Sequence, residues 1–248
     1  MTQTISTDST FRYDAFLGPV LDGELWRPLV TPQADESDWV YAEPDARVRF
    51  EGGAVEIGVE RFTRAHDGAQ SPDNAKHLMM STRAFPVPEN RTVTFAVDLA
   101  ARKLNGSPTD YRDGFVTFNV FDMQSLLVFD IISTGTRILS VYERLAVPGL
   151  VEGEDAFTYV IDPPLCGVCT APDVFQHCAI SLDSAAGSVE FRVDGVLVYS
   201  IASLPVIPRE LCLGMGLMTL LPIEDGRSVS LRGQGMVGRW RNFTCRVD

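Results

Sequence analysis

Hydrophobic and polar residues alternate along most of this chain, and long stretches with the 3.6-residue period of an amphipathic helix are absent. Residues 47–51 alternate, Gly52 and Gly53 follow, and residues 54–60 alternate again. Glycine adopts the positive φ angles of a tight turn without steric cost, so this pattern predicts a β-hairpin. The two alternating runs on either side of Asp194-Gly195 predict a second hairpin.

The same alternation predicts further strands over much of the remaining sequence. About a dozen short strands separated by turn residues are typical of an all-β sandwich. Two proline-bearing segments, residues 146–172 and 204–209, predict long surface loops, because a Pro-Pro pair cannot lie inside a central strand. No shift in composition marks a boundary, so we expect one domain over residues 1–248. The other predicted strands are residues 76–85, 91–99, 114–121, 126–133, 137–144, 178–183, 211–217 and 236–247.

Composition narrows the classes of partner. The 248 residues are 45% hydrophobic and 22% charged, so the chain can bury a core without disulfides or a metal. Its 33 acidic and 21 basic residues give a net charge of -12, which disfavours nucleic acid and anionic membranes as partners. The N-terminal segment lacks the basic and apolar parts of a secretory signal, so a cytoplasmic location is expected. The expected partner is a small-molecule ligand, and a homodimer is compatible with the sequence.

Three segments carry a resemblance to a known superfamily. They read HCAISLDSAAGSVEFRVDGVLVYSI, then LCLGMGL, and GRWRNFTCRVD at the end of the chain. These resemble the concanavalin A-like lectin and glucanase jelly rolls, in which a V-x-F-x-V-D-G hairpin follows a strand ending in Asp and a late aromatic strand pairs near the N-terminus. The early segment GPVLDGELWRPLV is also similar. The resemblance implies an all-β, two-sheet antiparallel jelly-roll sandwich with a ligand groove on its concave face.

The laminarinase-type members of that superfamily carry two glutamates flanking an aspartate at alternate positions of one strand. A retaining glycosidase needs such a nucleophile and general acid about 5 Å apart. The corresponding strand here has Asp130, but Val128 and Ile132 stand where the flanking acids would fall. The sequence therefore argues against glycoside hydrolysis by that mechanism.

Asp130 and His77 are the candidate catalytic residues. Asp130 is a single carboxyl group in an apolar strand, where it is either a proton-transfer group or a hydrogen-bonded structural residue. His77 has a side chain that suits a general base near neutral pH, although a single histidine is more often structural. Asn119 shares a strand face with Thr117, opposite an apolar face, and is a candidate ligand-binding residue.

The strand at residues 137–144 leaves two alternatives open. Either Tyr142 and Arg144 face the groove, or Glu143 and Arg137 do. Tyr142 and Arg144 are taken as candidate binding residues. Trp26 is a further candidate, because an aromatic face stacks on sugar rings, although aromatic residues more commonly fill cores.

The cysteines allow three interpretations. Cys166 and Cys169, with His177 and Cys178 downstream, have a spacing that suits a zinc site, a local disulfide or free thiols. Free thiols are favoured, so no metal is expected. The glycine-rich segments do not follow a phosphate-loop or dinucleotide pattern, so no cofactor is expected.

Two functions from different classes fit these observations. The first is a cofactor-independent cyclase, isomerase or lyase that binds a hydrophobic or glycosylated small molecule in the groove, in a bacterial specialised-metabolite pathway. Asp130 or His77 would then move a proton, and Asn119 or Tyr142 would bind a carbonyl or hydroxyl group. The alternative is a non-catalytic carbohydrate-binding module or a diverged glycoside hydrolase or lyase.

Overall fold

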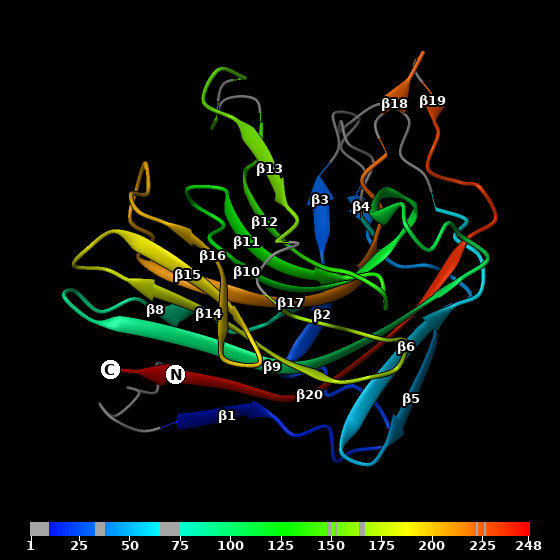
Figure 1. Cartoon of the computed structure of the whole chain (residues 1–248), viewed down its shortest axis with the longest axis horizontal. Helices are drawn as coiled ribbons and strands as arrows, with labels where there is room; N and C mark the ends of the chain where they lie inside the picture. Colours follow the sequence, from blue (N-terminus) through cyan, green and yellow to red (C-terminus); the bar gives the residue numbers. More distant parts are fainter. Residues whose placement is uncertain are drawn as a thin grey trace.

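The structure, a computed structural model, describes residues 10–32, 38–64, 75–147, 150–151, 153–163, 167–221, 223–225 and 227–248. Apart from one short 3-10 helix, η1 (Tyr111–Asp113), the elements of these residues are all strands. Two eight-stranded antiparallel sheets pack against each other as a sandwich (Figure 1). The predicted all-β sandwich is therefore confirmed. No helix in this part of the chain has the length and apolarity that crossing a membrane requires.

The first sheet brings both ends of the chain together. Its order is β16-β15-β14-β9-β20-β6-β5, and β1 pairs with β20. Thr10 lies opposite Arg246, so the late strand returns to the N-terminal one, as the resemblance implies. The strands are β1 (Thr10–Asp14), β5 (Arg47–Glu51), β6 (Ala54–Val59), β9 (Thr92–Leu104), β14 (Gln176–Asp183), β15 (Ser188–Val193), β16 (Val196–Ile201) and β20 (Gly235–Val247).

The second sheet has the order β13-β12-β11-β10-β17-β7-β2, with β8 paired to β17. Its strands are β2 (Trp26–Pro28), β7 (Ala75–Ser81), β8 (Phe85–Pro86), β10 (Phe115–Phe121), β11 (Leu127–Ser133), β12 (Ile138–Arg144), β13 (Phe157–Ile161) and β17 (Glu210–Met218). Two short hairpins, β3 (Val30–Pro32) with β4 (Asp38–Val40) and β18 (Ile223–Glu224) with β19 (Arg227–Ser228), complete the fold. In Figure 1, β13 lies to the left of β3 and β4, and β18 and β19 lie at the upper right.

Both predicted hairpins form with the expected turn residues. Gly52 and Gly53 have φ angles of 59° and 72° between β5 and β6, and Asp194 and Gly195 have 50° and 80° between β15 and β16. Positive φ at both central residues gives a turn whose twist matches that of the flanking strands.

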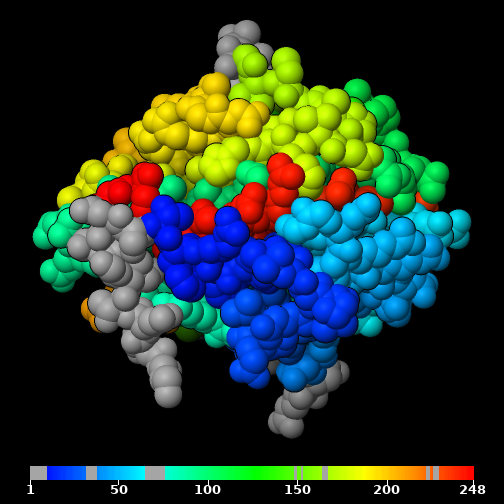
Figure 2. Space-filling model, turned by 90° about the horizontal axis from the view of Figure 1, so that it is seen from below, coloured from blue at the N-terminus to red at the C-terminus, as the bar shows by residue number. Residues whose placement is uncertain are grey.

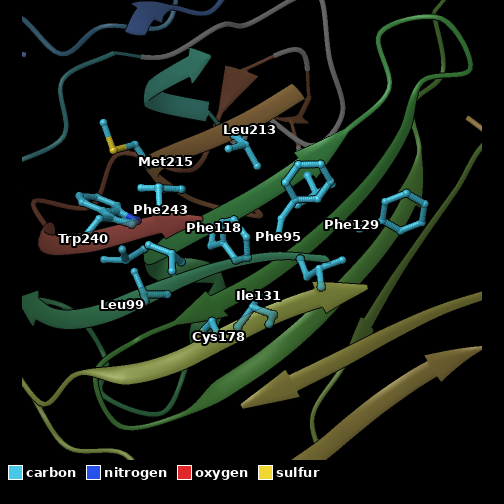
Figure 3. Packing of buried hydrophobic residues seen from close by; sticks show 14 of the residues in the cluster. Phe95, Leu99, Phe118, Phe129, Ile131, Cys178, Leu213, Met215, Trp240 and Phe243 are labelled. Atoms are coloured by element: carbon cyan, nitrogen blue, oxygen red, sulfur yellow. The ribbon is translucent and has the colours of Figure 1, made fainter. Parts of the chain in front are cut away.

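The main core lies between the two sheets. Aromatic side chains from both sheets meet there, and Figure 3 shows Phe95, Phe118, Phe129, Trp240 and Phe243 in this layer. Phe118 and Phe243 pack edge to face with ring centroids 5.8 Å apart. Aromatic pairs in this arrangement contribute stability beyond the area that they bury. The core therefore fixes which face of each strand points away from the sandwich.

Two of the differences from the sequence prediction concern the strand at residues 76–85 and the loop at residues 146–172. The predicted strand at residues 76–85 is divided into β7 and β8, because the Thr82 backbone N–H donates to Leu25 O, beyond the ladder between β7 and β17. The predicted loop at residues 146–172 contains β13, an edge strand that pairs with β12. Its five residues are flanked by turn-forming and proline-bearing segments, and the whole region was therefore predicted as a loop.

Candidate functional site

The candidate site lies on the face of the second sheet that points away from the first, here called the distal face. Val116, Phe118 and Val120 of β10 belong to the core between the sheets. Successive side chains of a strand point to opposite faces, so Thr117 and Asn119 point to the distal face. The same alternation places Asp130 of β11 and Glu143 of β12 there.

Strand register brings the polar side chains of the distal face together. Asn119 lies directly opposite Asp130, and Asp130 lies opposite Val141. Glu143 lies two residues beyond Val141 on β12, which makes it the diagonal neighbour of Asp130. Diagonal neighbours on adjacent strands have Cα atoms about 7–8 Å apart and are within reach of long side chains. Asn119, Asp130 and Glu143, from three neighbouring strands, thus lie close together on the distal face.

Hydrogen bonds fix both carboxyl groups. The Asn119 Nδ2 group donates to Asp130 Oδ1 at 2.7 Å. The Thr158 hydroxyl of β13 donates to Glu143 Oε2 at 3.1 Å. Gly214 of β17 makes room for Asn119, because a Cβ atom at Gly214 would lie 3.0 Å from both Cβ and Oδ1 of Asn119. The backbone of β17 therefore helps to set the position of the asparagine.

Burial keeps these carboxyl groups protonated at unusually high pH. Asp130 is 3% exposed and Glu143 is 5% exposed. Burial, together with the nearby charge of Glu143, raises the pKa of Asp130 well above its usual value, and the Asn119 hydrogen bond opposes this only in part. Burial also raises the pKa of Glu143 to about 7, against the lowering effect of Thr158. The pair therefore retains a proton near neutral pH.

Apolar side chains flank the pair on both sides. One cluster on the distal face contains Ile132 and Val141, and a second contains Phe121 and Val128. Leu29, just before β3, packs against both clusters. This surrounding of low polarity strengthens any electrostatic interaction made by the two carboxyl groups.

Two polar atoms beside the pair have no hydrogen-bond partner in the part of the chain that the structure describes. They are Asn119 Oδ1 and Thr117 Oγ1, and both are buried. An unsatisfied buried polar atom costs free energy of roughly 1–3 kcal/mol. These atoms are the natural hydrogen-bonding points for a bound ligand.

The structure brings together two of the six sequence-predicted site residues, Asp130 and Asn119. His77 lies on the other face of β7, with Met79 of the main core. Its Nδ1 atom accepts a hydrogen bond from the Glu43 backbone N–H at 3.3 Å, and burial lowers its pKa to about 4. His77 is therefore a neutral imidazole on the core side, away from the carboxyl pair.

The remaining three sequence-predicted residues lie elsewhere. Tyr142 stacks on Phe129 in the main core, with ring centroids 5.8 Å apart. Trp26 is also in that core, where its indole N–H donates to Asp14 at 2.8 Å. Arg144 ends β12, and its Nε donates to Ser125 O at 3.2 Å. Of the two faces left open for this strand, the one with Glu143 points to the distal side.

Sequence reasoning did not single out Glu143 as a catalytic residue, and it missed Thr158. The sequence signal for Glu143 was the alternation of β12, but alternation alone does not show which face of the strand packs on the core. Thr158 lies in β13, within the segment predicted as a loop. Arg137, which shares the parity of Glu143, precedes β12 and forms an ion pair with Asp162 at the far end of the strand.

The cysteines do not form a site in the described residues. Cys169 is an exposed free thiol, while Cys178 is buried in the main core. His177 points to the opposite face, where its Nδ1 lies 2.9 Å from Asp98 Oδ1. Cys166 lies outside the described residues. No group of three or more potential metal ligands occurs in the part of the chain that was described.

Comparisons with known proteins place the fold but not the activity. Residues 13–248 match the model of a family described as a family of unknown function, DUF6081. No curated protein matches the chain. Solved structures that it resembles include the endo-β-1,3-glucanase of Pyrococcus furiosus, at 12% identity and a TM-score of 0.58, with 100% of this chain and 99% of that one covered.

Two further structures show the same architecture. The endo-1,3-β-glucanase of Streptomyces sioyaensis has 11% identity and a TM-score of 0.57, with 97% of this chain and 96% of that one covered. The marine PL7 alginate lyase of Zobellia galactanivorans has 13% identity and a TM-score of 0.54, with 92% and 97% covered. The fold is therefore a concanavalin A-like jelly roll, as the sequence resemblance implies. Identities this low show the fold alone.

Proposed function

The chain belongs to the family of unknown function DUF6081, and we propose that it is an enzyme in which Asp130 and Glu143 act as an acid–base pair. Its substrate is a small, partly apolar molecule that carries hydroxyl or carbonyl groups and binds against the distal face. One observation carries this proposal. Two buried carboxyl groups from neighbouring strands lie side by side, and burial raises the pKa of both.

The proton that the pair shares supplies the chemistry. Near neutral pH the charged form of one carboxyl disfavours ionisation of the other. The protonated group then donates a proton to the substrate, while the ionised group accepts one. Asn119 orients Asp130 through the 2.7 Å hydrogen bond. Cyclisation, isomerisation and elimination each need an acid and a base, and none of them needs a cofactor.

The surroundings of the pair support a small ligand. Asn119 Oδ1 accepts a hydrogen bond, and Thr117 Oγ1 both donates and accepts, so both suit a hydroxyl group on the ligand. The apolar clusters around Ile132 and Phe121 suit an apolar part of the same molecule. The carboxyl groups are only 3–5% exposed, so a ligand reaches them only when the side chains that cover them move.

The test is a screen of hydroxylated and glycosylated small molecules by thermal shift, followed by calorimetry of the best ligand in buffers of different ionisation enthalpy. We expect binding to be linked to proton uptake or release near neutral pH. Asp130→Asn and Glu143→Gln should each abolish this proton linkage and lower turnover by 10²-fold or more. A matched control is Glu190→Gln, which removes a half-buried carboxyl group from the other sheet.

Two results would contradict the proposal. In the first, both carboxamide variants fold and turn over the substrate at the rate of the unchanged protein. In the second, a ligand binds the distal face tightly but is recovered unchanged, which would identify a binding module.

A second candidate is a diverged glycoside hydrolase or lyase, and the fold supports it, because the similar structures include glucanases and an alginate lyase. The laminarinase arrangement of acids along one strand is missing, since Val128 and Ile132 flank Asp130. A pair formed across two strands, Asp130 and Glu143, could take its place. Release of reducing ends from laminarin, or of unsaturated products from alginate, that is lost in Glu143→Gln would favour this candidate.

A further inference from the structure

A hollow lies on the side of the sandwich opposite the carboxyl pair, on the outer face of the first sheet. It has a volume of about 780 Å³ and spans β5, β6, β20 and β9. In Figure 2, β20 (red) is seen between the blue to cyan N-terminal strands and the yellow to green strands. We call this hollow the arginine groove. It shares no residue with the acid–base pair on the distal face.

The floor of the arginine groove is formed by two paired residues, one of which has no side chain. Gly58 of β6 lies opposite Val237 of β20. Arg47 flanks Gly58 on one side, and Arg102 flanks Val237 on the other. Strands in a sheet are about 4.8 Å apart, so the two arginine Cα atoms stand roughly 14 Å apart across the floor. A Cβ atom at Gly58 would meet only Val237 Cγ2, at 3.5 Å.

The groove has an excess of unused hydrogen-bond donors. Arg47, Arg49 and Arg61 line it and have no ion-pair partner among the residues that the structure describes. Arg102 uses its Nε atom for Asp173, at 2.9 Å, and keeps its terminal NH2 groups. Guanidinium groups bind carboxylate and phosphate oxygens in pairs. A cluster of unpaired arginines is unexpected in a chain with a net charge of -12.

A buried hydrogen-bond donor beside the groove also lacks a hydrogen-bond partner. Arg239 follows Val237 by two residues and lies opposite Glu56, which lines the groove. Its Nε atom is 3.9 Å from Glu56 Oε2, which is too far for a hydrogen bond, and it has no hydrogen-bond partner in the described part of the chain. The guanidinium group also packs over the Phe175 ring, with its central carbon 5.2 Å from the ring centroid. Asp45 and Glu60 also line the groove. Their carboxylates accept hydrogen bonds from hydroxyl groups.

We propose that the arginine groove is a binding site for a sugar that carries a carboxylate or a phosphate. The arginines bind the acidic group, and Asp45 and Glu60 bind the hydroxyl groups. Charges of both signs in one groove select for a ligand that is both anionic and hydroxylated, and they reject a simple polyanion. The site lies on the face of the sandwich opposite the acid–base pair, so it is separate from the proposed catalysis.

The experiment is calorimetric titration of the whole chain at low ionic strength with glucuronate, glucose 6-phosphate, neutral glucose and inorganic phosphate. We expect at least one of the two sugar anions to bind more tightly than glucose and more tightly than phosphate. The double variant Arg47→Gln/Arg49→Gln should weaken this binding about tenfold or more. Gly58→Val, which raises the floor, should weaken it while leaving Tm unchanged.

The matched control is Arg192→Gln/Arg246→Gln. These arginines lie on the same sheet but already pair with Glu190 and Asp248, so their loss should leave binding unchanged. The proposal is overturned if neither sugar anion binds at millimolar concentration. It is also overturned if the Arg47→Gln/Arg49→Gln variant binds like the unchanged protein. In that case these arginines only protect the edge strand β5 from pairing with other chains. If inorganic phosphate and glucose 6-phosphate bind equally well, the groove does not recognise the sugar, and the proposal is wrong.

Discussion

Asn119 and Asp130 lie directly opposite each other on β10 and β11, and the asparagine amide donates a 2.7 Å hydrogen bond to the carboxyl group. This contact ties together the two central strands of the distal face. It also holds Asp130 next to Glu143 of the following strand, since Glu143 is the diagonal neighbour of Asp130. The candidate chemistry of the protein depends on this arrangement across three strands, and the predictions below test its parts.

Glu143→Gln should change how stability depends on pH. The pKa of Glu143 rises from 4.5 to about 7 on folding, so the unfolded chain loses this proton at lower pH than the folded one. The contribution of Glu143 to stability is therefore fully present below pH 4.5 and is lost as pH rises to about 7. The variant cannot ionise at this position, so its free energy of unfolding should not fall in this way. Relative to the unchanged protein, its free energy of unfolding should rise by roughly 3 kcal/mol between pH 4.5 and 8.

Urea unfolding of both proteins at a series of pH values measures this difference. Glu190→Gln serves as the control, because it makes the same chemical change at a half-buried carboxyl group on the other sheet, which pairs with Arg192. A Glu143→Gln curve parallel to that of the unchanged protein would mean that Glu143 ionises normally.

Thr158→Val should raise the pKa of Glu143 further. The threonine hydroxyl donates to Glu143 Oε2 at 3.1 Å, and this bond favours the ionised carboxylate. Valine keeps the shape of the side chain and suits an edge strand. Carbon-13 NMR of the side-chain carboxyl group follows the titration directly. An unchanged or lower pKa in the variant would contradict the role of this hydrogen bond.

Gly214→Ala should disturb the site through Asn119. The added Cβ would lie 3.0 Å from Cβ and Oδ1 of Asn119, so the asparagine must shift away from its bond with Asp130. We expect a loss of stability on the order of 1–3 kcal/mol. Gly58→Ala is a matched control, because its Cβ would make only an ordinary 3.5 Å contact with Val237. Thermal unfolding compares the two, and equal Tm values would show that β17 does not constrain Asn119.

Trp240→Phe should weaken the strand beneath the site. The indole N–H of Trp240 donates to Thr117 O at 3.0 Å, inside the core and across the two sheets. Phenylalanine removes this hydrogen bond and creates a small cavity. The expected cost is on the order of 2 kcal/mol. Urea unfolding gives this value, and faster hydrogen exchange at β10 should accompany it. Unchanged protection of β10 would argue that the two sheets are held together elsewhere.

The class of fold and much of the strand layout could be predicted from the sequence. Alternation and turn residues are local properties, so residues 47–60 predicted β5 and β6, and Asp194-Gly195 predicted the turn between β15 and β16. Asp130 and Asn119 were also identified from their strands alone. The strand β13 was not predicted, because it is a five-residue edge strand next to proline-bearing segments.

Which side chains meet depends on how the strands pack and pair, and this could not be predicted from the sequence. Alternation divides β12 into two faces but does not say which one packs on the core, and the packing of Tyr142 against Phe129 settles this in favour of a distal Glu143. The packing of Met79 in the main core likewise places His77 on the core side of β7, away from Asp130. Register between strands is set by contacts among residues far apart in the chain, and a slip of one residue would move every side chain to the other face. The pairing of Asp130 with Glu143 is a property of that register, and no segment of the sequence contains it alone.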